Sequence, residues 1–309
     1  MLITVTLNPA VDKTAYLENF SSGSVNRVKE VRKDAGGKGI NVSKVAAKLG
    51  GTTAALGFLG GSAGEFISEE ITQFDIEQDF VWLAGETRTN LKIVDTVSGV
   101  ETEVNEPGAK VSDAELAKLE EKIMKVVGPD DSVILTGSLP PGVADDIYAR
   151  LIDDLSSTDT KVFLDASDNS LEQGINSVPF LVKPNLAELE SLLDQQLETT
   201  EEIIKAAQKL QDQGIEIVVI SLGSEGSLVV AQENCFKVIP PKVKASSTIG
   251  AGDTLVGALA LKLEAGSSLK EAMQYATAAS ANSVTKAGTQ LCEQNEVEEL
   301  LSEVEIVDL

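Results

Sequence analysis

Short apolar runs alternate with amphipathic segments along most of the chain. The runs at residues 2–7, 53–59, 131–136, 161–165, 180–184 and 216–221 have the length and β-branched content of buried strands. Residues 43–49, 65–73, 112–127, 145–155, 199–213 and 268–284 predict the intervening helices, three of which open with a Ser/Thr-x-x-Glu capping box. This alternation predicts an α/β fold with a doubly wound, mostly parallel sheet covered by helices on both faces.

Two segments do not follow this rhythm. Residues 10–33 and 86–106 alternate in a strand-like way without an intervening helix. We expect them to form a small sheet that leaves one single domain, residues 1–309, at two places.

Composition narrows the possible functions. The 309 residues include 25 Lys and Arg against 49 Asp and Glu, a net charge of −24, which opposes non-specific binding to nucleic acid or to an anionic membrane surface. An anionic substrate must therefore meet basic side chains that are concentrated locally.

The chain contains no histidine, which excludes His-based triads, His metal ligands and His general bases. Its two cysteines give no disulfide framework and no zinc spacing, and no apolar run reaches the length of a membrane span. The first residues lack a basic segment and an apolar signal core. We expect a cytoplasmic protein.

The most informative stretch is Gly250-Ala251-Gly252-Asp253, which leads into an apolar helix. A helix start presents backbone N–H groups that have no intrahelical partner, and the helix dipole adds positive charge there, so this turn suits a phosphoryl group. Asp253 in the first turn could accept a proton from an attacking hydroxyl. An ordinary glycine-rich turn with a capping carboxylate explains the same residues.

Most other unusual clusters follow predicted strands. The loops at residues 8–12, 57–64, 137–142, 183–188, 221–226 and 250–253 all fall at carboxyl ends of strands. Ligands of open α/β sheets bind at this edge. Their convergence favours a functional role for each cluster.

Residues 36–41 read Gly-Gly-Lys-Gly-Ile-Asn. The glycines allow close backbone approach, and Lys38 and Asn41 add a cation and an amide. The motif is not a Walker A loop, because Gly39 rather than Ser or Thr follows Lys38. Ligand contact and a plain tight helix start both explain it.

Arg27, Lys38 and Arg88 are basic residues in loops of an acidic protein, and a guanidinium fork suits bidentate phosphate binding. Solvated surface charge is the alternative for each. Asp12 could hydrogen-bond sugar hydroxyls or be an exposed loop residue.

Asn185 and Glu188 lie three apart, a spacing that serves either a helix cap or the orientation of Mg²⁺ and its waters. Residues 221–226 either cradle nucleotide phosphates or form a turn between a strand and a hairpin.

Together these motifs resemble those of the ribokinase-like, PfkB-type carbohydrate kinases. The resemblance rests on Gly-Gly-Lys-Gly-Ile-Asn-Val near residue 40, Gly-Ser-Leu-Pro-Pro-Gly at 137–142, Lys-Pro-Asn-x-x-Glu at 183–188 and Gly-Ala-Gly-Asp at 250–253. It covers essentially the whole chain in order. Thr-Leu-Asn-Pro-Ala-Val-Asp at 6–12 and Asn-Arg-Val at 26–28 are similar to the phosphosugar branch. Ser247 departs from the Asp that many members place there, which weakens a simple ribokinase assignment.

The resemblance implies a role for each matching residue. It implies Asp253 as the catalytic base, the Gly250, Ala251 and Gly252 amides as an anion hole, and Asn185 with Glu188 as the Mg²⁺ site. The implied sugar-phosphate contacts are Asp12, Arg27, Gly36, Gly37, Lys38, Asn41, Arg88 and Ser138. The implied ATP contacts are Lys183, Asn185, Ser221, Gly223, Gly226, Ser247, Gly252 and Asn282. Residues 10–33 and 86–106 would form a β-sheet lid, which in relatives often also makes a dimer contact.

We therefore expect an ATP- and Mg²⁺-dependent kinase that phosphorylates a ketohexose monophosphate and forms a homodimer through the lid. Fructose 1-phosphate is the favoured substrate and tagatose 6-phosphate the alternative. Fructose 6-phosphate and a non-catalytic sugar-phosphate sensor are less favoured. A nucleoside or vitamin kinase would leave Arg27, Lys38 and Arg88 without an anion to bind.

Overall fold

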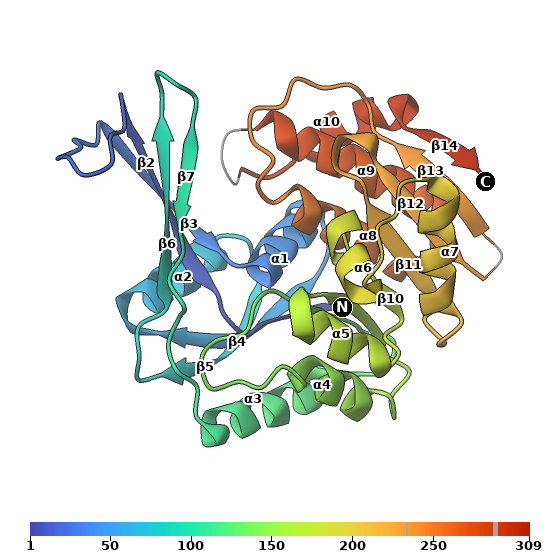
Figure 1. The fold of residues 1–309 in the computed structure, drawn as a ribbon. Coiled ribbons are helices and arrows are strands. Elements are labelled where there is room, and N and C mark those ends of the chain that lie inside the picture. The colour runs from blue at the N-terminus through green and yellow to red at the C-terminus, as the bar shows by residue number, and fades with distance from the viewer. Residues whose placement is uncertain (233, 287–289) are drawn as a thin grey trace.

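The structure is a computed structural model that describes residues 1–232, 234–286 and 290–309. Within these ranges, ten strands form a large sheet at the centre of the molecule, and four strands form a smaller sheet that stands apart from it (Figure 1). The order in the large sheet is β14 (Glu305–Asp308), β13 (Asn234–Ile239), β12 (Ser227–Ala231), β11 (Ile217–Ser221), β10 (Leu181–Val182), β9 (Lys161–Asp165), β8 (Ser132–Thr136), β1 (Leu2–Thr6), β4 (Thr53–Gly60) and β5 (Glu77–Leu83).

The strands from β11 to β5 run parallel, and β12 to β14 add an antiparallel edge. Successive side chains of a parallel strand point to opposite faces, and helices cover both. In β11, Val218 and Ile220 pack into one apolar cluster, whereas Ile217 and Val219 pack into the other. This double burial explains why the strand reads as a continuous apolar run.

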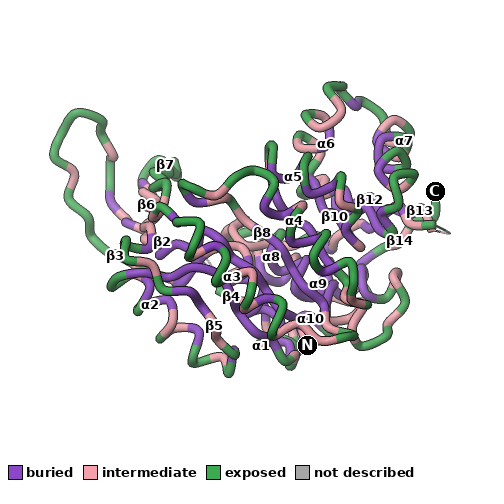
Figure 2. The backbone as a smooth tube through the Cα atoms, turned by 90° about the horizontal axis from the view of Figure 1, so that it is seen from below, coloured by how far each residue is buried: buried purple, intermediate pink, exposed green. Residues whose placement is uncertain are grey.

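Two helical layers complete these clusters. One layer contains α3 (Asp113–Val126), α4 (Ile147–Leu155), α5 (Asp168–Asn176), α6 (Leu186–Leu193) and α7 (Thr200–Gln211), and the other contains α1 (Lys38–Lys48), α8 (Ala251–Glu264), α9 (Leu269–Thr285) and α10 (Gln294–Leu300). A tube coloured by burial shows the sheet as the buried centre (Figure 2).

The small sheet has the order β3 (Glu30–Gly36), β2 (Ala10–Leu17), β6 (Arg88–Asp95) and β7 (Glu101–Val104). The chain leaves the large sheet after β1 and returns through α1, then leaves again after β5 and returns through α3. Helix α2 (Gly61–Thr72) packs between the two sheets, where Ile67 and Ile71 contact an apolar cluster that includes Val11 of β2 and Leu59 of β4.

The predicted doubly wound, mostly parallel sheet with a separate small sheet is confirmed. Several boundaries differ from the sequence pattern. The strand predicted at 180–184 is only Leu181–Val182, and the helices predicted from residues 43 and 65 begin at Lys38 and Gly61. Gly37 starts the first of these helices early because its φ of 107° turns the chain directly from β3 into α1. Among the helices described, none has the length and apolar character that spanning a lipid bilayer requires.

Candidate active site

The start of α8 is an uncapped helix N-terminus on a rigid support. Gly250 adopts a left-handed conformation with φ 74°, α8 begins at Ala251, and no side chain caps the helix. The first amides therefore lack intrahelical partners, although the Ala251 amide makes a long hydrogen bond of 3.4 Å to the Thr248 carbonyl. Residues Asp253 to Ala260 are buried, which fixes this helix in the core.

Asp253 lies in the first turn of α8 with only 8% of its surface exposed. Its Oδ2 accepts a hydrogen bond of 2.7 Å from Nδ2 of Asn41. Burial and the nearby charge of Asp165 raise the pKa of Asp253 to about 6, although Asn41, Lys38 and Lys183 act in the opposite direction. A carboxylate with such a pKa is ionised near neutral pH and can still accept a proton.

Asp165, at the end of β9, is a residue that the sequence analysis missed. Its Oδ1 lies 3.1 Å from Nζ of Lys183, its Oδ2 lies 3.3 Å from Nζ of Lys38, and Thr136 donates to Oδ2 at 3.2 Å. Burial alone would raise the pKa of Asp165, but Lys183 and Lys38 outweigh it and lower the pKa. A carboxylate at the carboxyl end of a central strand was the available signal.

Lys183 and Lys38 therefore converge beside the helix start from different parts of the chain. A Cβ added at Gly252 would lie 3.8 Å from Nζ of Lys183, so this ammonium group faces the first turn of α8. Burial lowers the pKa of Lys38, but Asp165 and Asp253 outweigh this effect and raise it. Lys38 therefore stays charged near neutral pH, which suits contact with phosphoryl oxygens.

Arg88 lies at the end of β6 nearest the large sheet. Its Nε and Nη2 donate to the carbonyl of Asn8 at 3.2 and 2.9 Å, and Nη2 also donates to Oγ of Ser138 at 3.2 Å. The Asn8 side chain, which the sequence analysis did not assign, donates to Leu139 O at 3.2 Å. These bonds bring the loops after β1 and β8 together around one guanidinium group.

Asp12 and Gly36 lie on the same side of the site as Arg88. The register pairs Ala10 with both Gly36 and Arg88, which places Gly36 and Arg88 at the same end of the small sheet. A Cβ at Gly36 would lie 2.1 Å from Oδ2 of Asp12, so only glycine leaves room for that carboxylate. Asn90 donates to Oδ1 of Asp12 at 3.1 Å.

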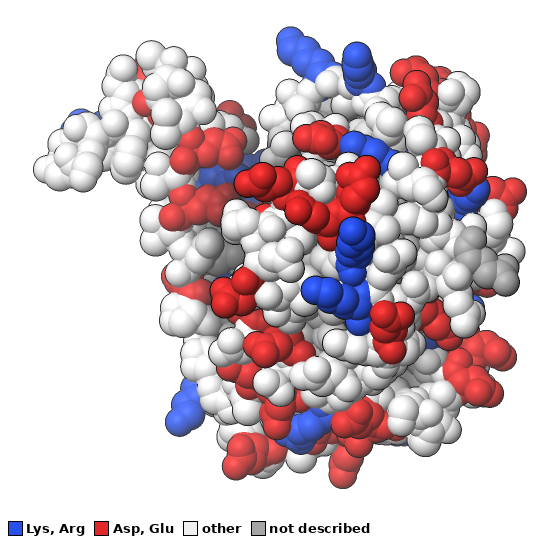
Figure 3. All heavy atoms as spheres, turned by 45° about the vertical axis from the view of Figure 1, so that its right-hand side comes forward, with Lys and Arg blue, Asp and Glu red and all other residues white. Residues whose placement is uncertain are grey.

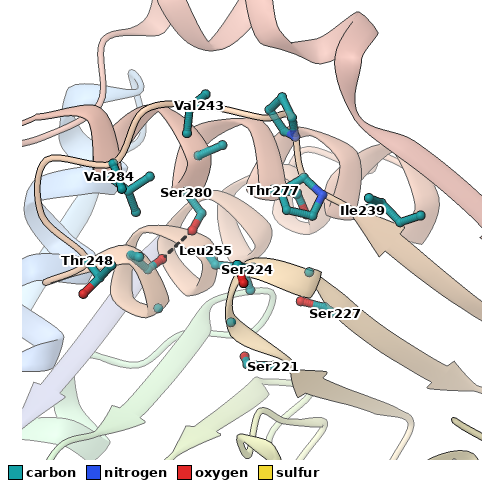
Figure 4. A pocket seen from close by; sticks show the side chains of 18 of the residues that line it. Ser221, Ser224, Ser227, Ile239, Val243, Thr248, Leu255, Thr277, Ser280 and Val284 are labelled. Carbon is teal, nitrogen blue, oxygen red and sulfur yellow. Dashed lines mark hydrogen bonds between the residues drawn. The ribbon is translucent and has the colours of Figure 1, made fainter.

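A cavity of about 560 Å³ opens on the other side of the α8 start. Ser221, Gly223, Gly226 and Gly252 line it, together with Thr277, Ser280, Ala281 and Val284 of α9 and the segment 239–245. Figure 4 shows these side chains around the cavity, with Ser280 donating to the carbonyl of Ala251 at 2.9 Å. The walls combine prolines and aliphatic groups with a few hydroxyls, as a nucleoside site requires.

Asn185 and Glu188 form a capping box at the start of α6. Oδ1 of Asn185 accepts from the Glu188 amide and Oε2 of Glu188 accepts from the Asn185 amide, both at 2.8 Å. Asn185 forms a β-bridge with Ser221, so the box lies beside the cavity. No cluster of three or more His, Cys, Asp or Glu ligands occurs in the described part of the chain.

Three assigned residues lie apart from the others. Arg27 is exposed in the connection after β2, at the end of the small sheet where Tyr16 pairs with Glu30. Gly36 lies at the other end of the same strand as Glu30, six residues or roughly 20 Å away. Ser247 does not line the cavity, and its amide donates to the Val284 carbonyl at 3.1 Å. Asn282 is buried and binds Glu296 and the amide of Glu293, which holds the start of α10 in place. Their predicted contacts remain predictions.

Comparisons with known proteins show which family the chain belongs to. The model of the pfkB family carbohydrate kinases matches residues 5–296. The chain belongs to this family. It is 34% identical over 310 residues to a 1-phosphofructokinase of Borreliella burgdorferi, covering 100% of this chain and 99% of that one.

Solved structures give the same result. Phosphofructokinase-2 from Escherichia coli, solved in complex with potassium, superposes with a TM-score of 0.93 at 32% identity, covering 97% of this chain and 98% of that one. A ribokinase from Thermotoga maritima, with a TM-score of 0.80 at 24% identity over 98% and 99% of the chains, shares the fold. The resemblance to PfkB-type kinases and the ribokinase-like fold are confirmed.

Proposed function

We propose that this pfkB family kinase transfers the γ-phosphoryl group of ATP to the C6 hydroxyl of fructose 1-phosphate. The observation that carries the proposal is the buried Asp253, with a pKa raised to about 6, at an open helix start between a nucleoside-sized cavity and the Arg88 loops. Relatives at 33–38% identity over 89–100% of this chain that are named 1-phosphofructokinase support the choice of sugar.

In this mechanism Asp253 accepts the proton of the C6 hydroxyl while the oxygen attacks the γ-phosphorus. The amides of Gly250, Ala251 and Gly252 would stabilise the developing charge on the transferring group, the Ala251 amide by exchanging its long, 3.4 Å hydrogen bond to the Thr248 carbonyl. Lys183 and Lys38, held on Asp165, flank the same position. Phosphoryl transfer depends mainly on such positioning and electrostatic stabilisation.

The sugar phosphate binds on the side of the small sheet. Its phosphate at C1 contacts Arg88 and Ser138, whose guanidinium and hydroxyl groups already meet at 3.2 Å. Asp12 accepts hydrogen bonds from sugar hydroxyls beside Gly36 and Gly37. The distance between this phosphate site and Asp253 determines how long the acceptor molecule can be.

ATP occupies the cavity, with its phosphates directed toward Gly252. Mg²⁺ would neutralise charge on those phosphates, and the residues present fit an ion held mainly by phosphates and water. Glu188 uses Oε2 in the capping box, and its Oε1 accepts no hydrogen bond from the described residues, so it is available to a water of the ion. Asn185 holds Glu188 in this orientation.

The test is coupled ADP release with Mg-ATP and, in parallel, fructose 1-phosphate, tagatose 6-phosphate and fructose 6-phosphate. The highest kcat/KM for fructose 1-phosphate supports the proposal. Fructose 6-phosphate is the second candidate, because Escherichia coli phosphofructokinase-2 in complex with fructose-6-phosphate superposes with a TM-score of 0.91 at 31% identity. Sugar-phosphate binding without ADP release would instead indicate a sensor.

We also propose that the single domain carries the small sheet, built from 10–33 and 86–106, as a lid, and that two copies pair through it. On the face opposite Asp12, Val31 and Val104 are 48% and 55% exposed. Leu91, which pairs with Val104, and Ile93, which pairs with Ala15 on the strand next to Val31, extend the same apolar face. Arg27 could reach a sugar phosphate only in a second copy. Sedimentation of the wild type and of Val31→Asp tests this pairing, and a monomeric wild type refutes it.

A further inference from the structure

We infer that Asn41 is a positioning residue for the catalytic base. Its amide fixes one carboxylate oxygen of Asp253 and leaves the other free to take the substrate proton. This inference rests on the proposed function of Asp253. It assigns Asn41 a role beyond the sugar contact that the sequence suggested.

The first support is the contact itself. Asn41 and Asp253 are 9% and 8% exposed, and Nδ2 of Asn41 donates to Oδ2 of Asp253 at 2.7 Å. Such charge-assisted bonds are stronger than neutral ones. Among the described residues Oδ1 accepts no hydrogen bond, so it is the oxygen left for the C6 hydroxyl.

The second support is the packing that sets the distance. Helices α1 and α8 lie side by side, and their first turns carry Asn41 and Asp253 (Figure 1). A Cβ added at Gly257 would lie 3.0 Å from the carbonyl of Val42 and 3.3 Å from Cγ1 of Val45. Glycine at 257 therefore allows the close approach of the two helices that brings Asn41 to Asp253.

The third support comes from the charges around Asp253. Asp165 on β9 raises the pKa of Asp253, whereas Lys38 on α1 and Lys183 after β10 lower it, and Asn41 lowers it through the hydrogen bond. Asn41 is the one neutral partner in this set. Its removal should therefore shift the base toward the protonated form without removing a charge from the phosphate sites.

The test uses Asn41→Ala, Gly257→Ala and Ser138→Ala in the full-length protein. Carbon-13 NMR of labelled carboxylates gives the titration of Asp253 in the substrate-free protein, and Asp253→Asn identifies its signal. The kcat–pH profile with Mg-ATP and the preferred ketohexose phosphate reports the same group during turnover. Gly257 touches neither substrate site, so Gly257→Ala separates base positioning from sugar contact.

We expect Asn41→Ala to move the Asp253 titration and the acidic limb of kcat to higher pH and to lower kcat at pH 7 roughly 10-fold. Gly257→Ala should shift the Asp253 titration and the acidic limb in the same direction by a smaller amount. Ser138→Ala should raise KM for the sugar phosphate and leave the acidic limb of the kcat–pH profile unchanged.

Two results would overturn the inference. An unchanged titration in Asn41→Ala shows that the amide does not act on the base. A shifted titration with unchanged kcat shows that the hydrogen bond has no role in turnover. A wild type that releases no ADP with any ketohexose phosphate refutes the proposed function, and with it the catalytic role of the bond, while the NMR titration still reports the contact.

Discussion

Replacing Asp253 with Asn should abolish most activity and also make the protein more stable at neutral and alkaline pH. Burial and Asp165 raise the pKa of Asp253 from its ordinary value of 3.8 to about 6. An acid whose pKa is raised by folding opposes folding once the pH exceeds its unfolded pKa, because the folded state disfavours the ionised form. The effect grows as the pH rises through the folded pKa and is constant above it.

The expected magnitude follows from the two pKa values. Their difference, 6 minus 3.8, is about 2 units, and one unit corresponds to about 1.4 kcal/mol. The free energy of unfolding of Asp253→Asn should therefore exceed that of the wild type by about 3 kcal/mol at pH 8. At pH 5 the same relation gives about half of that gain. An amide at position 253 keeps an oxygen that can accept from Asn41, so the hydrogen bond is preserved.

Thermal and urea unfolding of the wild type and Asp253→Asn at pH 5 and pH 8 measure this difference. Turnover should fall roughly 10²–10⁴-fold in the same preparation. Asp165→Asn is the matched control, because Lys183 and Lys38 lower the pKa of Asp165 and its ionised form stabilises the fold above its unfolded pKa. That variant should be less stable at pH 8. An Asp253→Asn protein that is no more stable than the wild type at pH 8 would refute the reasoning.

Three further perturbations address the other parts of the site. Arg88→Lys removes the guanidinium fork that contacts Asn8 and Ser138, so steady-state kinetics should show KM for the sugar phosphate raised roughly 10-fold or more with KM for ATP unchanged. Gly226→Ala places a Cβ 1.9 Å from the Val238 carbonyl at a φ of 92°, so calorimetry should show weakened ATP binding. Glu188→Gln should raise the Mg²⁺ concentration needed for half-maximal activity several-fold, while circular dichroism stays unchanged because Gln also serves in a capping box.

The sequence predicted the large sheet well because its strands are buried on both faces and therefore appear as uninterrupted apolar runs. Residues 216–221 are the clearest example, and they form β11 within one residue. The start of α8 was equally predictable, because Gly-Ala-Gly before an apolar helix has few other structural explanations. Both features are local, so a short window of sequence contains them.

Contacts between distant segments could not be predicted in this way. Asp165 gains its place in the site from Lys38 and Lys183, which lie 127 and 18 residues away along the chain. The strand before Asp165 gave no sign of either partner. Asn282 was predicted as an ATP contact, and its helix, α9, does line the cavity. Its side chain instead donates to Glu296. A residue on a functional helix contributes only if it lies on the right face.

The distribution of charge explains how so acidic a protein could bind two anions. Acidic side chains spread over the face seen in Figure 3, with groups of basic side chains between them, and acidic residues outnumber basic ones 49 to 25 in the chain. Surface charges farther than about 8–10 Å are largely screened at physiological salt, so the nearby groups decide the affinity. Around the α8 start, Lys38 and Lys183 are balanced by Asp165 and Asp253, and Arg88 is bound mainly to carbonyl oxygens. Without substrate these groups satisfy one another. Each ammonium group has three donors, so Lys38 and Lys183 can bind phosphoryl oxygens while they keep their contacts with Asp165, and no buried charge is left unpaired.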